Sequence, residues 1–492
     1  MRFLLLSLAL ALPNLSLAAD LNGYTAKHEC RIGNVNCDID LVPPNCDIVI
    51  DTSDTSWNKI YSNNGARTFC VSAGDHTSKG SINLNFSGGA NQRKWIRSTA
   101  TQNPIVQSPG SRATVKNIIF NGGQYWVIDR IAVNGQGSAD PAVWFKGGTN
   151  SGNNVINRSL LENGGTGYTG VVYIESGADD NAIQNSVIRN SIFVRDEDND
   201  CINLSNVTGT LIVNNEIYRC RGKGIFSPSG GPIPNAIIEN NDIYVDKSQQ
   251  SDCNGNVVAD GPCSGGESPI FLKSGGTLGK PVTVTKNRLW GVRFTDLNLC
   301  CGGGTSGAVV HLSRGTEAPQ HDGADYVLLH NNLIMGGQLG VASYPDGPEN
   351  ISVVGNIFYQ IRRYSTREVT GTMQLFTATK TEWYFNTVVD SDIWLSVHPD
   401  AALNDVRCNV AIASGSQSGQ SSSDTTIVDN MVYANAADAK GTEYCFWRKL
   451  HTGAEQICIP HARPTSSSPH AKACASAPGF RTGIGINDAP LL

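Results

Sequence analysis

The chain has 492 residues, of which 16% are charged and 52 are glycine, and its formal net charge at pH 7 is −6. This acidic balance argues against general binding of nucleic acids, which recruits clustered lysine and arginine. It also means that a polyanionic ligand would need a local cationic groove or a bound metal ion.

The first 18 residues are typical of a secretory signal peptide. Arg2 provides a basic start, residues 3–12 form an apolar stretch, and residues 16–18 match a small-x-small cleavage site. No later segment approaches the ~20 apolar residues that a membrane-spanning helix needs. We therefore predict a soluble, secreted or periplasmic protein without a membrane span, and we expect a monomer.

All fourteen cysteines follow this signal, and their even number indicates disulfides formed in an oxidising compartment. None has the paired C-x-x-C spacing of a zinc site. Adjacent Cys300 and Cys301 are expected to hold a loop in place. The full connectivity stays open, but the near pairs are Cys30 with Cys37 or Cys46, Cys253 with Cys263, and Cys445 with Cys458.

Three further regions follow the signal peptide. Residues 19–80 are rich in Cys and Asn with little periodicity, and we predict that they form an N-terminal cap. A cap is needed because the open end of a solenoid exposes apolar surface and unpaired strand edges. Residues 81–435 are predicted to form the repeating coils, and residues 436–492 a C-terminal cap or tail.

The repeat in residues 81–435 consists of an apolar segment, an Asn and a second apolar segment. The intervals between successive Asn residues are 25 (190 to 215), 26 (215 to 241), 46 (241 to 287), 45 (287 to 332) and 24 (332 to 356). Single and doubled intervals indicate one unit of about 22–26 residues with loops inserted in some turns. The predicted repeat positions are Asn190, Asn215, Asn241, Asn287, Asn332, Asn356, Asn386 and Asn430.

Such short, β-rich units cannot bury their apolar faces alone, so they must stack on one another. Stacked Asn side chains would then form an internal hydrogen-bonded ladder. We predict an all-β fold, a single-stranded right-handed parallel β-helix that forms a solenoid with N- and C-terminal caps.

A second strand recurs in each coil and provides a candidate ligand surface. Side chains alternate across a strand and neighbouring coils lie ~4.8 Å apart, so the outward residues form a continuous strip. Each residue alone is most simply a solvated surface residue, but exposed aromatics beside polar groups suit stacking on sugar rings. The predicted strip is Trp144, Lys146, Tyr173, Glu175, Asn203, Ser205, Phe271, Lys273, His311 and Ser313, with Trp144, Tyr173, Phe271 and His311 as substrate-binding candidates.

An acidic run near residue 200 is a candidate metal site. Carboxylates that crowd one turn repel each other unless a hard cation or a proton intervenes, and calcium is the natural cation for an exported protein. A solvated acidic turn is the simpler alternative. The predicted calcium ligands are Asp196, Asp198 and Asp200, with Asp180 and Glu267 as additional candidates.

Cationic residues lie on the following coils, with Lys223 in GKGIF, Lys273 in FLKSGG and Arg314 in HLSRG. A lysine beside other cations can act as a base near neutral pH, whereas an isolated outward lysine usually only improves solubility. Each lysine alone is therefore weak evidence for catalysis.

The signal, cap and Asn-repeat coils together resemble the pectin-lyase-like β-helix superfamily over most of residues 80–435. The segment ESPIFLKSGG followed by VVHLSRG is similar to the alginate lyase and chondroitinase B family. That resemblance implies Lys273 as the base, Arg314 as a neighbouring catalytic or subsite cation, and Glu267 as a calcium ligand. The acidic turn resembles the calcium-dependent pectate lyases of polysaccharide lyase family 9, which again implies Lys273 as the base and calcium at Asp196, Asp198 and Asp200.

Asp180, Asp200 and Lys223 also resemble the spacing in polygalacturonases, which are hydrolases. The intervals of 20 (180 to 200) and 23 (200 to 223) residues each match one coil, although Lys223 stands where that family has His. Glycoside hydrolysis needs two carboxyl groups about the scissile bond, ~6.5–9.5 Å apart if the enzyme inverts. Asp180, Asp198 and Asp200 are the candidates for this role.

The predicted function is cleavage of an acidic, uronate-containing polysaccharide by β-elimination, with calcium as the expected cofactor. Alginate, pectate and glycosaminoglycans all remain candidate substrates. Lys273 is the predicted base, Lys223 the second choice, and Arg314 the clamp on the substrate carboxylate. The alternatives are a polygalacturonase-like hydrolase and a non-catalytic, carbohydrate-binding surface β-helix.

Overall fold

The structure is a computed structural model. The predicted signal peptide and four predicted site residues, Asp196, Asp198, Glu267 and Arg314, lie outside the residues that it describes. The described residues are 44–102, 104, 107–148, 150–165, 169–190, 200–220, 222–244, 268–291, 308–313, 323–343, 347–362, 371–375, 378–415, 418–419, 425–435, 438, 441–450, 453–464 and 474.

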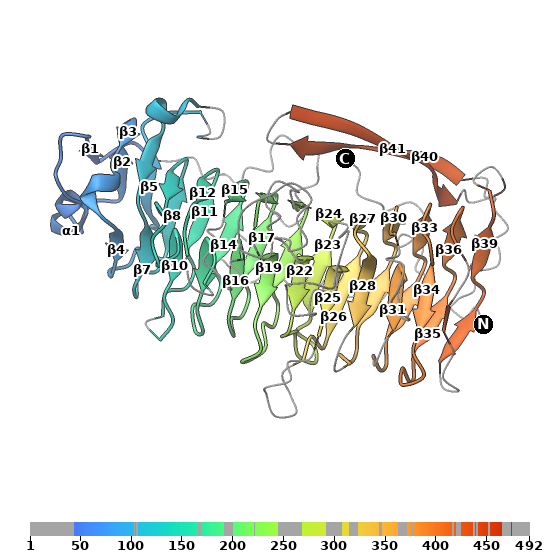
Figure 1. The fold of residues 1–492 in the computed structure, drawn as a ribbon. Helices are drawn as coiled ribbons and strands as arrows, with labels where there is room; N and C mark the ends of the chain where they lie inside the picture. Colours follow the sequence, from blue (N-terminus) through green and yellow to red (C-terminus); the bar gives the residue numbers. More distant parts are fainter. Residues whose placement is uncertain are drawn as a thin grey trace, which may run out of the picture.

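Three long parallel sheets form the body of the protein (Figure 1). Each coil contributes one strand to sheet A, then one to sheet B and one to sheet C, and each strand pairs with its counterparts in the coils before and after it. The predicted right-handed parallel β-helix is therefore confirmed. Sheet A consists of β1 (Ile48–Ile50), β2 (Thr68–Val71), β5 (Lys94–Ser98), β8 (Trp126–Asp129), β11 (Val155–Asn157), β14 (Ala182–Gln184), β17 (Leu211–Val213), β20 (Ile237–Glu239), β23 (Val282–Thr285), β26 (Val327–His330), β29 (Ser352–Val354), β32 (Glu382–Tyr384), β35 (Asp405–Arg407) and β38 (Thr426–Val428).

Sheets B and C follow the same stacking. Sheet B consists of β3 (Gly74–Asp75), β6 (Ala113–Val115), β9 (Ala132–Asn134), β12 (Leu160–Glu162), β15 (Val187–Arg189), β18 (Glu216–Tyr218), β21 (Asp242–Tyr244), β24 (Arg288–Gly291), β27 (Leu333–Gly336), β30 (Ile357–Tyr359), β33 (Thr387–Val389), β36 (Val410–Ile412) and β39 (Met431–Tyr433). Sheet C consists of β4 (Ile82–Leu84), β7 (Ile118–Phe120), β10 (Val143–Phe145), β13 (Val172–Ile174), β16 (Ile202–Leu204), β19 (Lys223–Ser227), β22 (Ser268–Leu272), β25 (Ala308–Leu312), β28 (Leu339–Ser343), β31 (Met373–Leu375), β34 (Leu395–Val397) and β37 (Ser418–Gly419).

One side of each strand faces a continuous core inside the coils. The aliphatic and aromatic residues that alternation predicts to point inward in sheet C are all buried in this core. The strands are short, so each coil buries only a few side chains and depends on its neighbours for the rest. The confirmed inward residues are Val143, Phe145, Val172, Ile174, Ile202, Leu204, Ile270 and Leu272.

An asparagine ladder runs through the corner between sheets A and B. The Asn287 side chain donates to Asn332 Oδ1 at 3.0 Å and to the carbonyl of Ile238 at 2.8 Å, while its own Oδ1 accepts from Asn241. The same arrangement repeats over seven coil steps, which confirms the predicted ladder. Its members are Asn215, Asn241, Asn287, Asn332, Asn356, Asn386, Asn409 and Asn430.

Two details of the ladder differ from the sequence prediction. Asn190 follows β15 instead of preceding it, so it is not a ladder residue, and Ser186 takes the position by donating its backbone N–H to Asn215 Oδ1. Asn409 is a ladder residue that the pattern missed. The pattern failed because an Asn on either side of the sheet B strand has similar apolar neighbours.

The residue before most ladder positions has a positive φ, as at Asn214 (59°), Asn240 (54°) and Asn331 (52°). Asn tolerates this left-handed conformation better than most residues. Only two residues then separate the strands of sheets A and B, so each Asn side chain enters the corner at the same place in every coil.

Strand stacking begins upstream of residue 81, where the coils were predicted to start, because β1 and β2 already belong to sheet A. A short helix, α1 (Asn58–Ser62), buries Ile60 at this end. At the other end, β40 (Gly441–Leu450) and β41 (Gly453–Pro464) form an antiparallel hairpin. Figure 1 shows this hairpin running alongside the coils, and its Tyr444 and Ile459 pack on the outer face of sheet B. The domain boundaries themselves stay predictions.

Every cysteine in the described ranges belongs to a disulfide. Cys445–Cys458 confirms the sequence prediction. Cys46 pairs with Cys70 and not with Cys30, because β1 stacks on β2 and brings Cys46, just before β1, close to Cys70 within β2. The remaining described bonds are Cys201–Cys220 and Cys408–Cys474, while the predicted Cys253–Cys263 pair and Cys300–Cys301 lie outside the described residues.

In the described part of the chain, no helix has the length and apolar character to cross a membrane.

The buried imidazole of His330 is expected to make stability depend on pH. Its Nε2 is buried without a hydrogen-bond partner, and burial lowers its pKa from 6.5 to about 4. The unfolded chain therefore binds more protons between these values, so this contribution to stability is complete above pH 6.5 and is lost as pH falls towards 4. The expected loss is about 3 kcal/mol at most. Urea unfolding of the wild type and His330→Phe between pH 7 and 4.5 should show a shallower pH slope for the variant, whereas equal slopes would contradict the assignment.

Candidate functional site

The predicted strip on sheet C exists as a row of register neighbours. Trp144 pairs with Tyr173, which pairs with Asn203, and further along the sheet Phe271 pairs with His311. Within this row the sequence analysis missed Phe226, which stands between Asn203 and Phe271. Alternation in GIFS after the buried Ile225 was the available signal.

Two lysines lie over the same pair of rings near the middle of this row. The Nζ atom of Lys223 is 5.1 Å from the ring centroid of Phe226 and 5.8 Å from that of Phe271. The Nζ atom of Lys273 is 5.8 Å and 5.5 Å from the same two centroids. These distances are in the range of cation–π attraction. The structure therefore brings together the two lysines that the sequence analysis singled out, and we call Lys223, Lys273, Phe226 and Phe271 the lysine–phenylalanine centre.

The two lysines approach the rings from opposite ends of neighbouring strands. Lys223 is the first residue of β19, and Lys273 follows the last residue of β22. Lys223 is 6% exposed, whereas Lys273 and Phe226 are partly exposed. A ligand on the outer face of sheet C would therefore meet Lys273 and Phe226 first.

His311 supports the centre from the next coil. Its ring stacks on that of Phe271 at a centroid distance of 4.1 Å and an interplanar angle of 9°. Both side chains are buried, at 6% and 8% exposure. One face of Phe271 is thus covered by His311, which orients the ring and leaves the two residues little surface for stacking on a sugar.

The two residues just before β16 hold the backbone of Lys223. Asp200 Oδ1 accepts the backbone N–H of Lys223 at 2.9 Å, and the backbone N–H of Cys201 donates to the Lys223 carbonyl at 2.9 Å. Cys201 is bonded to Cys220, three residues before Lys223 in the chain. Asp200, predicted to bind calcium, is 2% exposed and is engaged with this backbone.

A second aromatic pair lies on the N-terminal side of the centre. Trp144 and Tyr173 are partly exposed, and their rings stack at 6.4 Å. Lys146 Nζ lies 4.9 Å from the Trp144 ring centroid, and Glu175 accepts the backbone N–H of Gly147 at 2.8 Å. Burial raises the pKa of Tyr173, so its hydroxyl stays protonated at neutral pH. Trp144 and Tyr173 keep the accessibility that their predicted role requires.

The described residues do not assemble the predicted calcium site. Asp200 lies just before β16 at one edge of sheet C, whereas Asp180 lies beyond the other edge, in the turn between β13 and β14. The other predicted ligands, and the predicted clamp Arg314, lie outside the described residues. Among those that are described, one group of three potential ligand atoms gathers within 4.8 Å, Glu443 with Cys445 and Cys458, and its cysteines are bonded to each other.

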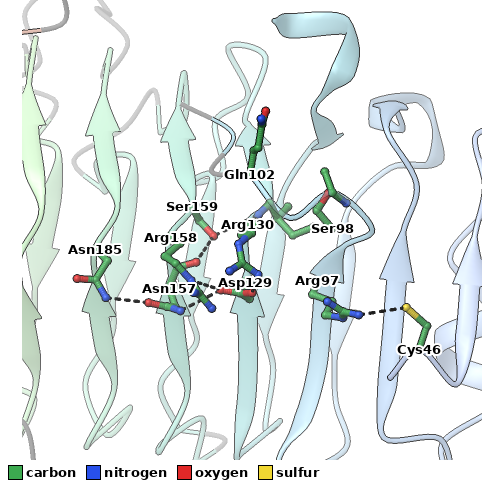
Figure 2. A network of polar contacts seen from close by, with 12 residues as sticks. Cys46, Arg97, Ser98, Gln102, Asp129, Arg130, Asn157, Arg158, Ser159 and Asn185 are labelled. Carbon is green, nitrogen blue, oxygen red and sulfur yellow. Dashed lines mark hydrogen bonds and ion pairs between the residues drawn. The ribbon is translucent and has the colours of Figure 1, made fainter. Parts of the chain in front are cut away.

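A polar network on sheet A is the other prominent cluster of charges (Figure 2). The fully buried Asp129 accepts from Arg130 at 3.0 Å, from Arg158 at 2.9 Å and from Asn157 at 2.9 Å. Asn185 on the next coil donates to Asn157 Oδ1 at 3.0 Å. Because each group pairs with another protein group, the network ties three coils together and is not a candidate site.

No protein-family model and no curated protein sequence matches the chain. Similar solved structures include the A-module of mannuronan C-5 epimerase AlgE6 from Azotobacter vinelandii, with 10% identity and a TM-score of 0.46 over 76% of this chain and 92% of that chain. Pectate lyase Pel9A has 10% identity and a TM-score of 0.40 over 79% of this chain and 80% of its own. A mannuronic acid-specific polysaccharide family 6 lyase from human gut microbiota has 11% identity and a TM-score of 0.42 over 78% and 86%. At such identities these likenesses concern the fold alone.

Proposed function

We propose that this protein is an exported polysaccharide lyase that cleaves a uronate-containing polymer by β-elimination on the outer face of sheet C. The observation that carries the proposal is the lysine–phenylalanine centre, where two cations share one aromatic pair. Because the chain is acidic overall, it needs a local positively charged site to bind an acidic polymer. The described disulfides support an oxidising compartment.

The two lysines have different roles in the proposed reaction. Removing the C5 proton of a uronate builds negative charge into the adjacent carboxylate, so a cation placed there lowers the barrier. Lys223, whose backbone is held by Asp200, supplies this charge. Lys273 is the more accessible of the two and takes the C5 proton as the base. The electron pair of the C–H bond forms the C4–C5 double bond, and the glycosidic oxygen leaves C4 with the electron pair of the broken C4–O bond and takes a proton from water.

The remainder of the row provides room for an extended chain. Trp144 lies three coil steps from Phe226, which is roughly 14 Å at ~4.8 Å per coil. Sugar rings of the same polymer can stack on Trp144 and Tyr173 while the scissile bond lies near Lys273. Arg314 is retained in the proposal as a clamp on a substrate carboxylate.

Calcium remains part of the proposal as a further neutralising charge near the acidic run. Asp196, Asp198 and Asp200 would hold it, and its chemistry would be that of a Lewis acid at the uronate carboxylate. Of the predicted ligands, the structure describes Asp180 and Asp200.

Ultraviolet absorbance of unsaturated uronate tests the reaction class directly. The full-length mature protein is incubated with alginate, pectate and a glycosaminoglycan, with a neutral glucan as control and with or without a chelator. We expect absorbance to rise on at least one acidic polymer only. New reducing ends without absorbance would indicate the hydrolase, and retention of the polymer without cleavage would indicate the carbohydrate-binding protein. Unchanged activity in the chelator would remove calcium from the proposal.

The hydrolase alternative is weakened by the placement of its carboxyl groups. Asp180 and Asp200 lie beyond opposite edges of sheet C, which does not favour this pair for a reaction that needs two carboxyl groups about one bond, and the third candidate, Asp198, lies outside the described residues. A binding protein would use Trp144 and Tyr173 equally well, but it would have no need for two lysines on one ring pair.

A further inference from the structure

We infer that Asp200 and the Cys201–Cys220 disulfide form a positioning unit that holds Lys223 over Phe226 and Phe271. The unit acts on the site of the proposed function, and only the activity measurement below rests on that function. Lys223 touches the ring pair itself, whereas the residues of the unit act through its backbone.

The contacts of Lys223 show how its backbone is fixed. Its N–H donates to the Asp200 carboxylate and its carbonyl accepts from Cys201, so two consecutive residues of the preceding coil hold both polar groups. In the strand register, Ile202 pairs with Ile225, which places Asp200 directly beside Lys223. The Asp200 carboxylate therefore accepts a backbone N–H at the edge of the sheet, where in a regular sheet the acceptor is a backbone carbonyl.

The disulfide fixes the segment that leads into Lys223. β18 ends at Tyr218 and β19 begins at Lys223, so four residues connect sheet B to sheet C here. Cys220 lies within this connection, and its partner Cys201 is the residue after Asp200. With a Cα–Cα distance of 5.2 Å, the bond ties the connection to Cys201, one of the two residues that hold the Lys223 backbone.

The expected consequence of losing the unit is local. The core and the asparagine ladder continue through the coils on both sides, because a solenoid is stabilised mainly by nearest-neighbour contacts. Lys273 belongs to the next coil and has no contact with the unit among its described interactions. Without the unit, Lys223 should leave the ring pair while the fold persists.

Amine-reactive labelling followed by mass spectrometry measures this without any substrate. In the wild type, Lys223 should label slowly because it is 6% exposed. In Cys201→Ala/Cys220→Ala and in Asp200→Ala, we expect its labelling rate to rise about tenfold or more, with Lys59 unchanged as an internal reference. Asp200→Asn keeps an acceptor oxygen and should stay closer to the wild type than Asp200→Ala. Cys46→Ala/Cys70→Ala, which removes a disulfide at the N-terminal end, should leave Lys223 protected.

Unchanged Lys223 labelling in both the disulfide and the Asp200→Ala variants would overturn the inference. So would an equal rise at every lysine, since that result means general loosening. In the polysaccharide assay, the same variants should lower kcat/KM, and Asp200→Asn should recover part of the loss. If the wild type cleaves no acidic polymer, the proposed function fails while the labelling still decides whether the positioning unit exists.

Discussion

Lys273→Ala is expected to lower kcat/KM on the preferred uronate polymer by about 100-fold or more. A positioned general base contributes roughly 10²–10⁴-fold to a proton transfer, and alanine cannot replace it. Lys273 is the more accessible cation at the lysine–phenylalanine centre, and its Nζ lies 5.5 Å from the Phe271 ring centroid. The loss should appear mainly in kcat, because the strip around Trp144 and Tyr173 still holds the polymer.

The matched control is Lys280→Ala. Lys280 is exposed in the turn between β22 and β23, seven residues from Lys273, and contacts the turn through its backbone. This variant should retain wild-type activity. Both variants should unfold near the wild-type urea midpoint, since a partly exposed cation–π contact contributes only about 0.5–1 kcal/mol. Full activity of Lys273→Ala on every polymer that the wild type cleaves would exclude Lys273 as the base.

Asn287→Ala is expected to lower the free energy of unfolding by about 3–5 kcal/mol. The substitution deprives the Ile238 carbonyl of its donor and the Asn241 backbone N–H and side-chain amide of their acceptor. Each buried polar group left without a partner costs roughly 1–3 kcal/mol, and partial relaxation keeps the sum below the simple total. Urea unfolding followed by circular dichroism would measure the effect.

Two other variants test whether the cost comes from the ladder. Asn287→Ser should be milder than Asn287→Ala, because a serine hydroxyl already accepts a backbone N–H at the equivalent upstream corners. There Ser159 Oγ accepts from Ile131 and Ser186 Oγ accepts from Ser159, while the backbone N–H of Ser186 donates to the first ladder residue. Asn430→Ala, at the last ladder position, should cost about 1 kcal/mol or less, since the side chain is partly exposed and water can take its place. Equal losses at Asn287 and Asn430 would show that burial within the ladder does not set the cost.

The β-helix and its ladder could be predicted because its contacts recur at one coil length. Each coil packs mainly on the coils before and after it, so the pattern of apolar and Asn residues reports the stacking directly. Alternation within short strands likewise placed Trp144, Tyr173, Phe271 and His311 in one row. The same reasoning mistook Asn190 for a ladder residue, because the apolar pattern does not show whether an Asn precedes or follows its strand.

Coil counting was less reliable for the site. The 20 residues between Asp180 and Asp200 equal about one coil, yet one residue follows a sheet C strand and the other precedes the next one. An interval of one coil length does not place two residues at the same position around the coil, because the connections between the sheets differ in length from coil to coil. The structure therefore separated two carboxylates that the interval placed together.

The sequence by itself determined the stacked coils, the strip on sheet C and the presence of lysines along it, because these depend on local alternation and a repeated length. Only the tertiary structure decided that Lys223 and Lys273 reach the same two rings from opposite strand ends, and that the Asp200 carboxylate is engaged by the Lys223 backbone. Those contacts depend on side-chain direction at the strand ends and on how the coils are cross-linked. Neither has a period that a sequence pattern can reveal.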